Sequence, residues 1–527
     1  MLNKQKNQIG EGFMSFLSNI KCKDFTKKFA KTLHLEVIKM FQKSQNQLTF
    51  VDDFFLPFGG RLNKDNRWVR LAEIIPWWKA EEKYAKSFKN SMKGEQALSV
   101  RVALGSLIIQ QRLGLSDRET VNQIMENPYL QYFIGLPSFQ EKAPFHHSLM
   151  TRFRKRLGPD IINEVNEWIV MEEQIQTDDQ DNDEGNDSSI NKTQTDNNDF
   201  DTKENRGKLI LDATCAPADI SYPTDFKLLN EAREKLEHII DVLHKPLKGT
   251  RKKPRTYRNR ARKEYLSIAK QRNICSKKMR KAVGKQLRYV KRNLEIVQQL
   301  TLESSLSLLS KHEYRQLLVI QELYRQQKEM YRAKTHRIDD RIVSISQPHV
   351  RPIVRGKAKA NVEFGSKVAI SVVNGYAMVE HLSWDNFNEG LTLQKSVENY
   401  RKRYGYYPEA VLADKIYRTR DNLKYCKERG IRLSGPRLGR PSKEEDYIQK
   451  QLTKIDASER NEVEGKFGTG KRSYGLGLIQ VCLEKTSETV VCLQFLVMNL
   501  ERRLKVLLCN FFRERIQRLI SQMTFCM

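Results

Sequence analysis

Between Glu95 and Gly158 the apolar residues recur with a period of about 3.6 positions, which predicts a series of short amphipathic helices. Ser116 opens a capping box, SDRE, that starts one of these helices, and Pro128 is expected to end it. A further helix with the sequence LMTRFRKRLG is expected to start near Ser148. Short helices with tight turns and a basic last helix suit a helix-turn-helix-like DNA-binding domain. A helical bundle with a solvated basic face fits the same pattern.

The composition changes at residues 172–206, which are rich in Asp, Asn, Gln and Thr and nearly lack large apolar residues. Such a segment buries too little apolar surface to offset its ordering entropy, so we expect a disordered acidic linker. The linker follows an all-helical domain at 95–171 and precedes the strand-like run LILDAT at 209–214. Residues 1–94 are mixed and aromatic-rich, and their pattern indicates no role.

Beyond the linker, strand-like and helix-like patterns alternate. A long helical pattern, 227–345, follows the first strand, and strand-like runs resume at 366–373 and 376–382 around Asn374-Gly375, a strong hairpin signal. The later predicted elements are a helix at 393–404, a strand at 410–414, a helix at 419–428 and a strand at 431–435. This order predicts a mixed α/β sheet interrupted early by a large helical insert. The sheet domain would therefore comprise residues 207–226 and 346–480, and residues 481–527 would form a C-terminal helical region.

The charge of the chain favours a polyanionic partner. Lys and Arg number 93 against 64 Asp and Glu, for a formal net charge of +29, and nucleic acid is the commonest partner of so basic a protein. A merely soluble basic protein is the alternative. The excess is concentrated in the insert, where Glu264 is the only acidic residue between Arg251 and Arg292. The candidate DNA-contacting residues are Arg251, Lys252, Lys253 and Arg255 in the insert and Arg152, Arg154 and Arg156 in the last helix of the preceding domain.

The cysteines and the apolar segments indicate the compartment. The 8 cysteines are scattered without a C-x-x-C pair, which is typical of reduced thiols in the cytosol. The first residues lack the apolar core of a signal peptide, and the apolar stretch Val490 to Leu500 is too short to span a bilayer. We therefore expect a soluble intracellular protein without a membrane partner.

Two of the predicted strands end on a carboxylate. LILDAT stops its aliphatic run at Asp212, and AVLAD stops at Asp414. Either acid alone could cap a helix or bond to a turn. Functional groups in open α/β sheets, however, collect at strand ends. Glu464 follows in a helix-favouring segment, RNEVEGKFGTGK, where Val463 and Phe467 share one face.

Together these three acids predict an oxygen-rich site for two Mg²⁺ or Mn²⁺ ions. Two such ions about 4 Å apart would activate a water or a DNA 3′-hydroxyl for in-line phosphoryl displacement. Arg460 and Lys471, in the same segment as Glu464, would supply positive charge for phosphates.

The same residues resemble those of DDE transposases of bacterial insertion sequences, in particular the IS-four and IS-five groups. The resemblance lies in DATCAPADISYPTDFKLLNEARE, in ADKIYRTRDN, in the spacing Arg460-x3-Glu464-x6-Lys471, and in the helical segment from about Ser99 to Gly158. Here Ala457 replaces the family's Tyr three residues before the Arg, and Gly465 replaces an Arg that often follows the Glu.

The resemblance implies a ribonuclease-H-like fold in which Asp212, Asp414 and Glu464 hold two divalent metals. It further implies binding of the element's terminal inverted repeats, cleavage of the ends, and joining to target DNA in the bacterial cytoplasm or nucleoid. A homodimer is expected, because two ends must be brought together.

Other functions fit the sequence less well. The run GKFGTGK has most of a P-loop, but Arg472 stands where Ser or Thr would bind Mg²⁺, and no apolar strand precedes it. A DNA-binding protein without catalysis, such as a decayed transposase, and a plain nuclease on the same fold are the two remaining alternatives. The first is distinguished by whether the three carboxyl groups converge, and the second by the absence of strand transfer.

Overall fold

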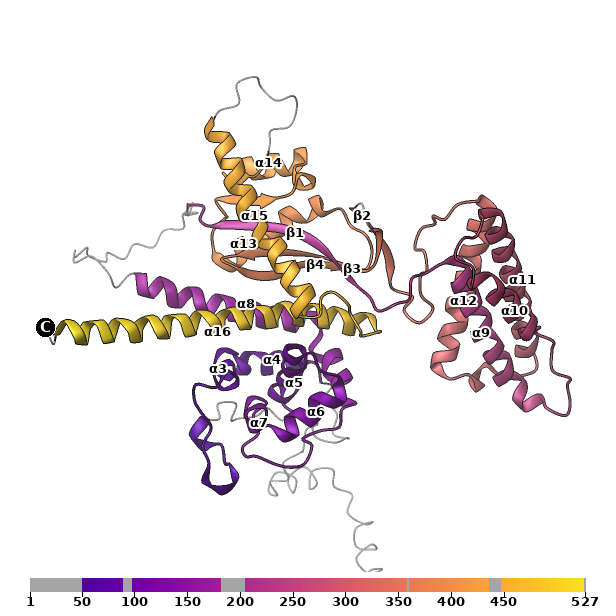
Figure 1. The fold of residues 1–527 in the computed structure, drawn as a ribbon, viewed down its shortest axis with the longest axis horizontal. Helices are drawn as coiled ribbons and strands as arrows, with labels where there is room; N and C mark the ends of the chain where they lie inside the picture. The colour runs from indigo at the N-terminus through magenta and orange to yellow at the C-terminus, as the bar shows by residue number, and fades with distance from the viewer. Residues whose placement is uncertain (1–49, 89–96, 182–203, 358–359, 436–446, 526–527) are drawn as a thin grey trace, which may run out of the picture.

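The computed structural model describes residues 50–88, 97–181, 204–357, 360–435 and 447–525. In this part of the chain a central sheet lies between helices, and a helical lobe projects from one end (Figure 1). The strands are β1 (Lys208–Pro217), β2 (Arg351–Lys357), β3 (Ala360–Val373), β4 (Tyr376–Ser383), β5 (Ala410–Ala413) and β6 (Arg432–Leu433). Their order is β2-β3-β1-β5-β6, with β4 paired to β3. β1 runs antiparallel to β3 and parallel to β5, so the mixed α/β sheet predicted from the sequence is confirmed.

The predicted hairpin is present between β3 and β4. Val373 pairs with Tyr376, and the two turn residues, Asn374 and Gly375, have φ values of 48° and 79°. Positive φ at both central positions is the type I′ geometry that matches the twist of the flanking strands. The sequence analysis missed β2 and the first part of β3. β2 alternates charged residues with few apolar ones, and of its described side chains only Ile353 is buried, so it leaves no clear strand pattern.

Helices cover both faces of the strands that lead to the two aspartates. Leu209, Leu211 and Val411 pack toward α13 (Leu393–Tyr404) and α14 (Arg420–Glu428). Ile210 and Leu412 belong to a second cluster with α15 (Tyr447–Ser473) and α16 (Glu484–Phe525). Burial on both faces explains why these strands read as continuous apolar runs rather than alternating ones.

The helices before the sheet share one core, whose elements are α3 (Arg67–Ile74), α4 (Trp77–Lys86), α5 (Val100–Leu113), α6 (Asp117–Glu126), α7 (Pro128–Phe133) and α8 (Leu149–Asp181). Trp68 and Trp77 both lie edge-on to Phe133, with ring centroids 5.2 Å and 5.7 Å away. The boundary placed at residue 95 is therefore wrong, since described residues before it complete the same core. Residues 1–49 lie outside the described part. α6 ends at Glu126, directly before the Asn127-Pro128 pair, as predicted from the sequence, and Pro128 also opens α7, behind the cap formed by Asn127.

α8 and α16 connect this helical unit to the sheet. α8 bends at Gly158, where φ is 60°, and continues to Asp181, so the first residues of the expected linker are helical. Glu172 near this end pairs with Lys79. Residues 182–203 of the expected linker lie outside the described residues. α16 buries Leu493 and Leu496 against the helical unit and Phe495 against the sheet, which accounts for its apolar stretch. No described helix combines the length and the apolar character needed to cross a bilayer.

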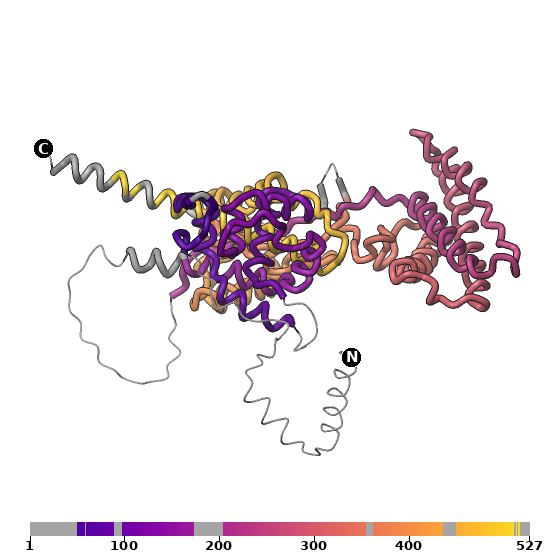
Figure 2. Tube along the Cα trace, turned by 90° about the horizontal axis from the view of Figure 1, so that it is seen from below, coloured from indigo at the N-terminus to yellow at the C-terminus, as the bar shows by residue number. Residues whose placement is uncertain are grey.

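The helical insert lies between β1 and β2 and forms its own lobe (Figures 1 and 2). It consists of α9 (Asp225–His244), α10 (Arg258–Ala269), α11 (Ser276–Thr301) and α12 (Lys311–Ala333). Leu229, Val290 and Ile320 are fully buried in a core separate from that of the sheet. Because the insert carries its own core, it interrupts the chain without disturbing the pairing of β1 with β3.

Candidate active site

The register of the parallel strands brings the two aspartates together. Leu211 pairs with Ala413, so continuing the same register by one residue places Asp212 beside Asp414. Asp414 follows the last residue of β5, as predicted, but the strand end expected at Asp212 is wrong, because β1 continues to Pro217 through its pairing with β3. Asp212 follows Ile210 by two positions and therefore lies on the sheet face that α15 covers. Both aspartates line one cavity of about 1010 Å³.

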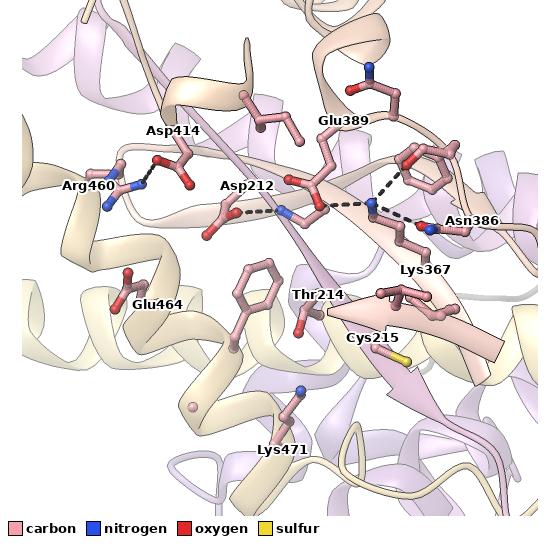
Figure 3. A pocket seen from close by; sticks show the side chains of 18 residues that line it. Asp212, Thr214, Cys215, Lys367, Asn386, Glu389, Asp414, Arg460, Glu464 and Lys471 are labelled. Carbon is pink, nitrogen blue, oxygen red and sulfur yellow. Dashed lines mark hydrogen bonds and ion pairs between the residues drawn. The ribbon is translucent and has the colours of Figure 1, made fainter. Parts of the chain in front are cut away.

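α15 contributes a single stripe of residues to that cavity. Arg460, Glu464, Phe467 and Lys471 follow one another at helical spacing, and all of them line the cavity. The neighbouring Val463 is fully buried against the sheet and fixes the rotation of the helix. Figure 3 shows Glu464 one turn along the helix from Arg460, on the side of Asp212 and Asp414. The residues predicted to hold the metal ions and the flanking phosphates thus lie around one cavity, although Asp212 and Glu464 are 252 positions apart along the chain.

The carboxylates differ in their partners. Asp212 accepts a hydrogen bond from the amide of Ala213 at 2.8 Å, and Asp414 accepts one from the amide of Lys415 at 2.7 Å. Arg460 Nη1 lies 3.4 Å from Asp414 Oδ1. Glu464 is exposed and forms no hydrogen bond or ion pair with any residue that the structure describes. Its side chain is therefore available to reorient toward the aspartates.

Burial is the main electrostatic influence on Asp212. It raises the pKa of Asp212 from 3.8 to about 6; the amide of Ala213 opposes the rise, and the nearby charges of Glu389 and Asp414 add to it. The positive charge of Arg460 opposes the rise without cancelling it, so the cavity lacks enough compensating positive charge for Asp212. A cation in the cavity would supply that charge.

Two charged residues of the cavity were not predicted from the sequence. Lys367 on β3 donates a hydrogen bond to the carbonyl of Phe387 at 2.8 Å, and its Nζ lies 2.9 Å from Glu389 Oε1 (Figure 3). Glu389 sits in a short 3-10 helix after β4, where no strand ends on it and no spacing links it to the other acids. Only the folded arrangement reveals it as a further carboxylate of the cavity.

The donor set suits a hard divalent cation, because carboxylate, amide and hydroxyl oxygens predominate among the polar groups of the cavity. Within the described ranges, no three His, Cys, Asp or Glu side chains are gathered closely enough to hold a metal ion as they stand. The three predicted acids therefore share a cavity without forming the closed cage expected from the sequence.

The predicted DNA-contacting arginines of α8 differ in exposure and in their partners within the protein. Arg154 is wrong as a DNA contact: it is only 5% exposed, and its guanidinium pairs with Asp117 and donates to Gln110. The guanidinium of Arg156 lies 4.1 Å from the centre of the Phe88 ring, which commits it to packing. Arg152 is exposed, as the prediction requires.

Of the four predicted DNA contacts in the insert, two are paired with acids of the protein and two are exposed. Arg251 pairs with Glu303 in the turn after α11, and Lys253 Nζ lies 2.6 Å from Asp241 Oδ1 of α9, so an acid neutralises each of them. Lys252 and Arg255 are exposed. The acids were missed because they are distant in sequence from the basic run. The P-loop-like run GKFGTGK lies inside α15, and a continuous helix is not a phosphate-binding loop.

Comparison with known proteins relates the chain to transposases. Residues 411–501 match the family described as "Transposase DDE domain", and residues 57–156 match "Transposase domain (DUF772)". The chain is 30% identical over 175 residues to "Uncharacterized protein ORF8 in nfe locus" of Rhizobium meliloti, a match that covers 33% of this chain and 73% of that protein. No solved structure matches the chain. The matches show that the chain belongs to the family of transposases with a DDE domain.

Proposed function

We propose that the protein binds the terminal inverted repeats of its own insertion sequence, cleaves the ends and joins them to target DNA. The proposal extends to a ribonuclease-H-like catalytic domain, a homodimer in the active complex and a place in the bacterial cytoplasm. One observation carries it: Asp212, Asp414 and the α15 stripe of Arg460, Glu464 and Lys471 line a single cavity. That combination of acids and cations fits phosphoryl transfer on a polyanion.

In this proposal Asp212, Asp414 and Glu464 hold two Mg²⁺ or Mn²⁺ ions, which would supply activation of the attacking oxygen and stabilisation of the leaving oxygen. Arg460 and Lys471 bind the phosphates that flank the scissile bond. Phe467 and Phe387 give the cavity apolar walls that limit water around the reacting phosphate. The exposed Arg152, Lys252 and Arg255 hold the DNA outside the cavity.

The proposal is tested by incubating the protein with the DNA that flanks its gene and Mg²⁺, then mapping nicks and joined products. Nicks at the element ends together with joined products are expected. Nicks without joining would indicate a plain nuclease. Specific binding of the ends without any nick would indicate a decayed transposase that acts only as an end-binder.

The pKa of Asp212 predicts how cation binding depends on pH. A divalent ion requires the ionised carboxylate, so binding to Asp212 below its pKa of about 6 releases a proton. We expect Mn²⁺ affinity, measured by calorimetry, to fall about tenfold for each pH unit below that value. The metal-free protein should show the opposite trend in stability: the raised pKa favours the folded state most below 3.8, and this contribution is lost as pH rises through about 6. Affinity that does not change between pH 7 and 5 would contradict the role of Asp212 as a ligand.

Glu389→Gln tests whether Glu389 acts on Asp212 only through its charge or is itself a ligand of the ion. The charge of Glu389 helps to raise the pKa of Asp212, so its removal should shift the pH midpoint of Mn²⁺ binding downward while affinity at high pH is retained. Asp385→Asn, in the same loop but outside the cavity lining, is the control and should leave the midpoint unchanged. Loss of affinity at every pH would instead make Glu389 a ligand of the ion.

A further inference from the structure

A second polar cavity lies on the helical insert. It measures about 300 Å³ and is lined by Tyr257, Arg260, Glu264, Lys285, Arg288, Tyr289 and Arg292, which come from α10 with its N-cap and from α11. Four of these side chains are cations and one is an anion, so the cavity keeps an excess of positive charge. None of them lines the carboxylate cavity described above.

Glu264 organises one wall of this insert cavity. Its carboxylate accepts hydrogen bonds from Arg260 Nε and from the Tyr289 hydroxyl, each at 3.3 Å, and Lys285 Nζ is also 3.3 Å away. Burial pushes the pKa of Glu264 upward, but the bonds from Lys285 and Arg260 outweigh it, so the net shift is downward. Glu264 thus stays ionised and holds two cations in place, while it neutralises only part of their charge.

Arg288 and Arg292 supply the uncompensated charge. Neither forms an ion pair with any residue in the described part of the chain. The guanidinium carbon of Arg292 lies 4.8 Å from the centre of the Tyr257 ring and 5.5 Å from that of Tyr289, so the aromatic rings set its position. Arginine held in this way keeps its planar donor edge for a phosphate, with which it forms paired hydrogen bonds.

Tyr257 has an unusual backbone conformation. Its φ is 55°, in the left-handed region that a bulky residue adopts only at a cost of about 1 kcal/mol or more. Tyr257 is 47% exposed and lines the cavity in this strained conformation. An exposed aromatic ring beside arginines is a common platform for a nucleotide sugar or base.

We propose that this insert cavity binds a backbone phosphate of DNA through Arg288 and Arg292, with the Tyr257 ring against the adjoining sugar or base. The inference rests on the proposed function, which makes DNA the substrate. It places the main DNA contact of the insert at α10 and α11 rather than at residues 251–255, where Glu303 and Asp241 neutralise two of the four cations.

The test measures binding of the full-length protein to a fluorescent DNA duplex of mixed sequence over a range of salt concentrations. Arg288→Gln combined with Arg292→Gln should weaken binding about tenfold or more and reduce the slope of log affinity against log salt by about 2. Arg262→Gln combined with Lys263→Gln is the matched control: it removes the same charge from exposed α10 positions outside the cavity. The control should change the slope by less than half as much.

Two further measurements identify the ligand. Tyr257→Ala should weaken DNA binding several-fold without changing the salt slope, because it removes a contact but no charge. The second measurement compares ATP with unlabelled DNA as competitors for the bound duplex, at equal concentrations of phosphate groups. If ATP displaces the duplex at a far lower phosphate concentration than DNA does, the cavity is a free-nucleotide site and the inference is overturned. Equal slopes for the cavity variant and its control would also overturn it. If the unmodified protein does not bind DNA at all, the proposed function itself fails, which distinguishes the two outcomes.

Discussion

Asp212→Asn, Asp414→Asn and Glu464→Gln are each expected to reduce cleavage of the element's ends by about a thousandfold or more. Each substitution keeps the size of the side chain and removes one anionic oxygen ligand from the carboxylate cavity. DNA binding should remain nearly unchanged, because it depends on cations elsewhere on the surface. Cleavage is measured on end-containing DNA with Mg²⁺, and binding by mobility shift in its absence.

Glu462→Gln is the matched control for these variants. Glu462 is an exposed carboxylate on α15, two residues from Glu464, but it does not line the carboxylate cavity. The control should cut at the normal rate. A variant of Asp212, Asp414 or Glu464 that also cuts at the normal rate would show that its residue is no metal ligand. Equal loss of cleavage and binding would mean that the substitution had disturbed the fold rather than the chemistry.

The main elements of the site were predictable because each has a local cause. Asp212 and Asp414 interrupt apolar runs, and a strand buried on both faces tolerates such a residue only where it ends or serves a site. Arg460 and Glu464 share a helix side through their spacing of four, which holds wherever α15 lies. The hairpin at Asn374-Gly375 is equally local, since the two residues accept positive φ.

The remaining features depend on contacts that no local pattern encodes. Lys367 pairs with Ser383 at the end of β4 and meets Glu389 in the segment that follows, and nothing in their own sequence neighbourhoods indicates a pair. Arg154 has the same exposed-looking sequence context as Arg152, yet it meets Asp117 of α6 across the helical core. Residues distant in sequence therefore decide whether a basic side chain serves the fold or remains at the surface.

Gly465 departs from the pattern of DDE transposases, and its surroundings would accept a larger side chain at little structural cost. A Cβ built at this position meets no other atom within 4 Å, so the site offers open space where related sequences often carry Arg. Gly365 is the opposite case. It joins three strands, pairing with Pro217 of β1 and Arg351 of β2, and a Cβ there would lie 2.1 Å from the carbonyl oxygen of Ala216.

Replacing Gly365 or Gly465 with alanine is the same chemical change, but the two substitutions are expected to have opposite effects on stability. Gly365→Ala should destabilise the sheet by about 3 kcal/mol or more, because the clash is with backbone and β1 must move away. Gly465→Ala should stabilise α15 by up to about 1 kcal/mol, because alanine is the better helix former and meets no obstacle. Both are measured by denaturant unfolding followed by circular dichroism. Since β1 also carries Asp212, Gly365→Ala should lower Mn²⁺ affinity, whereas an unchanged affinity and stability would mean that β1 and β3 are not joined in this register.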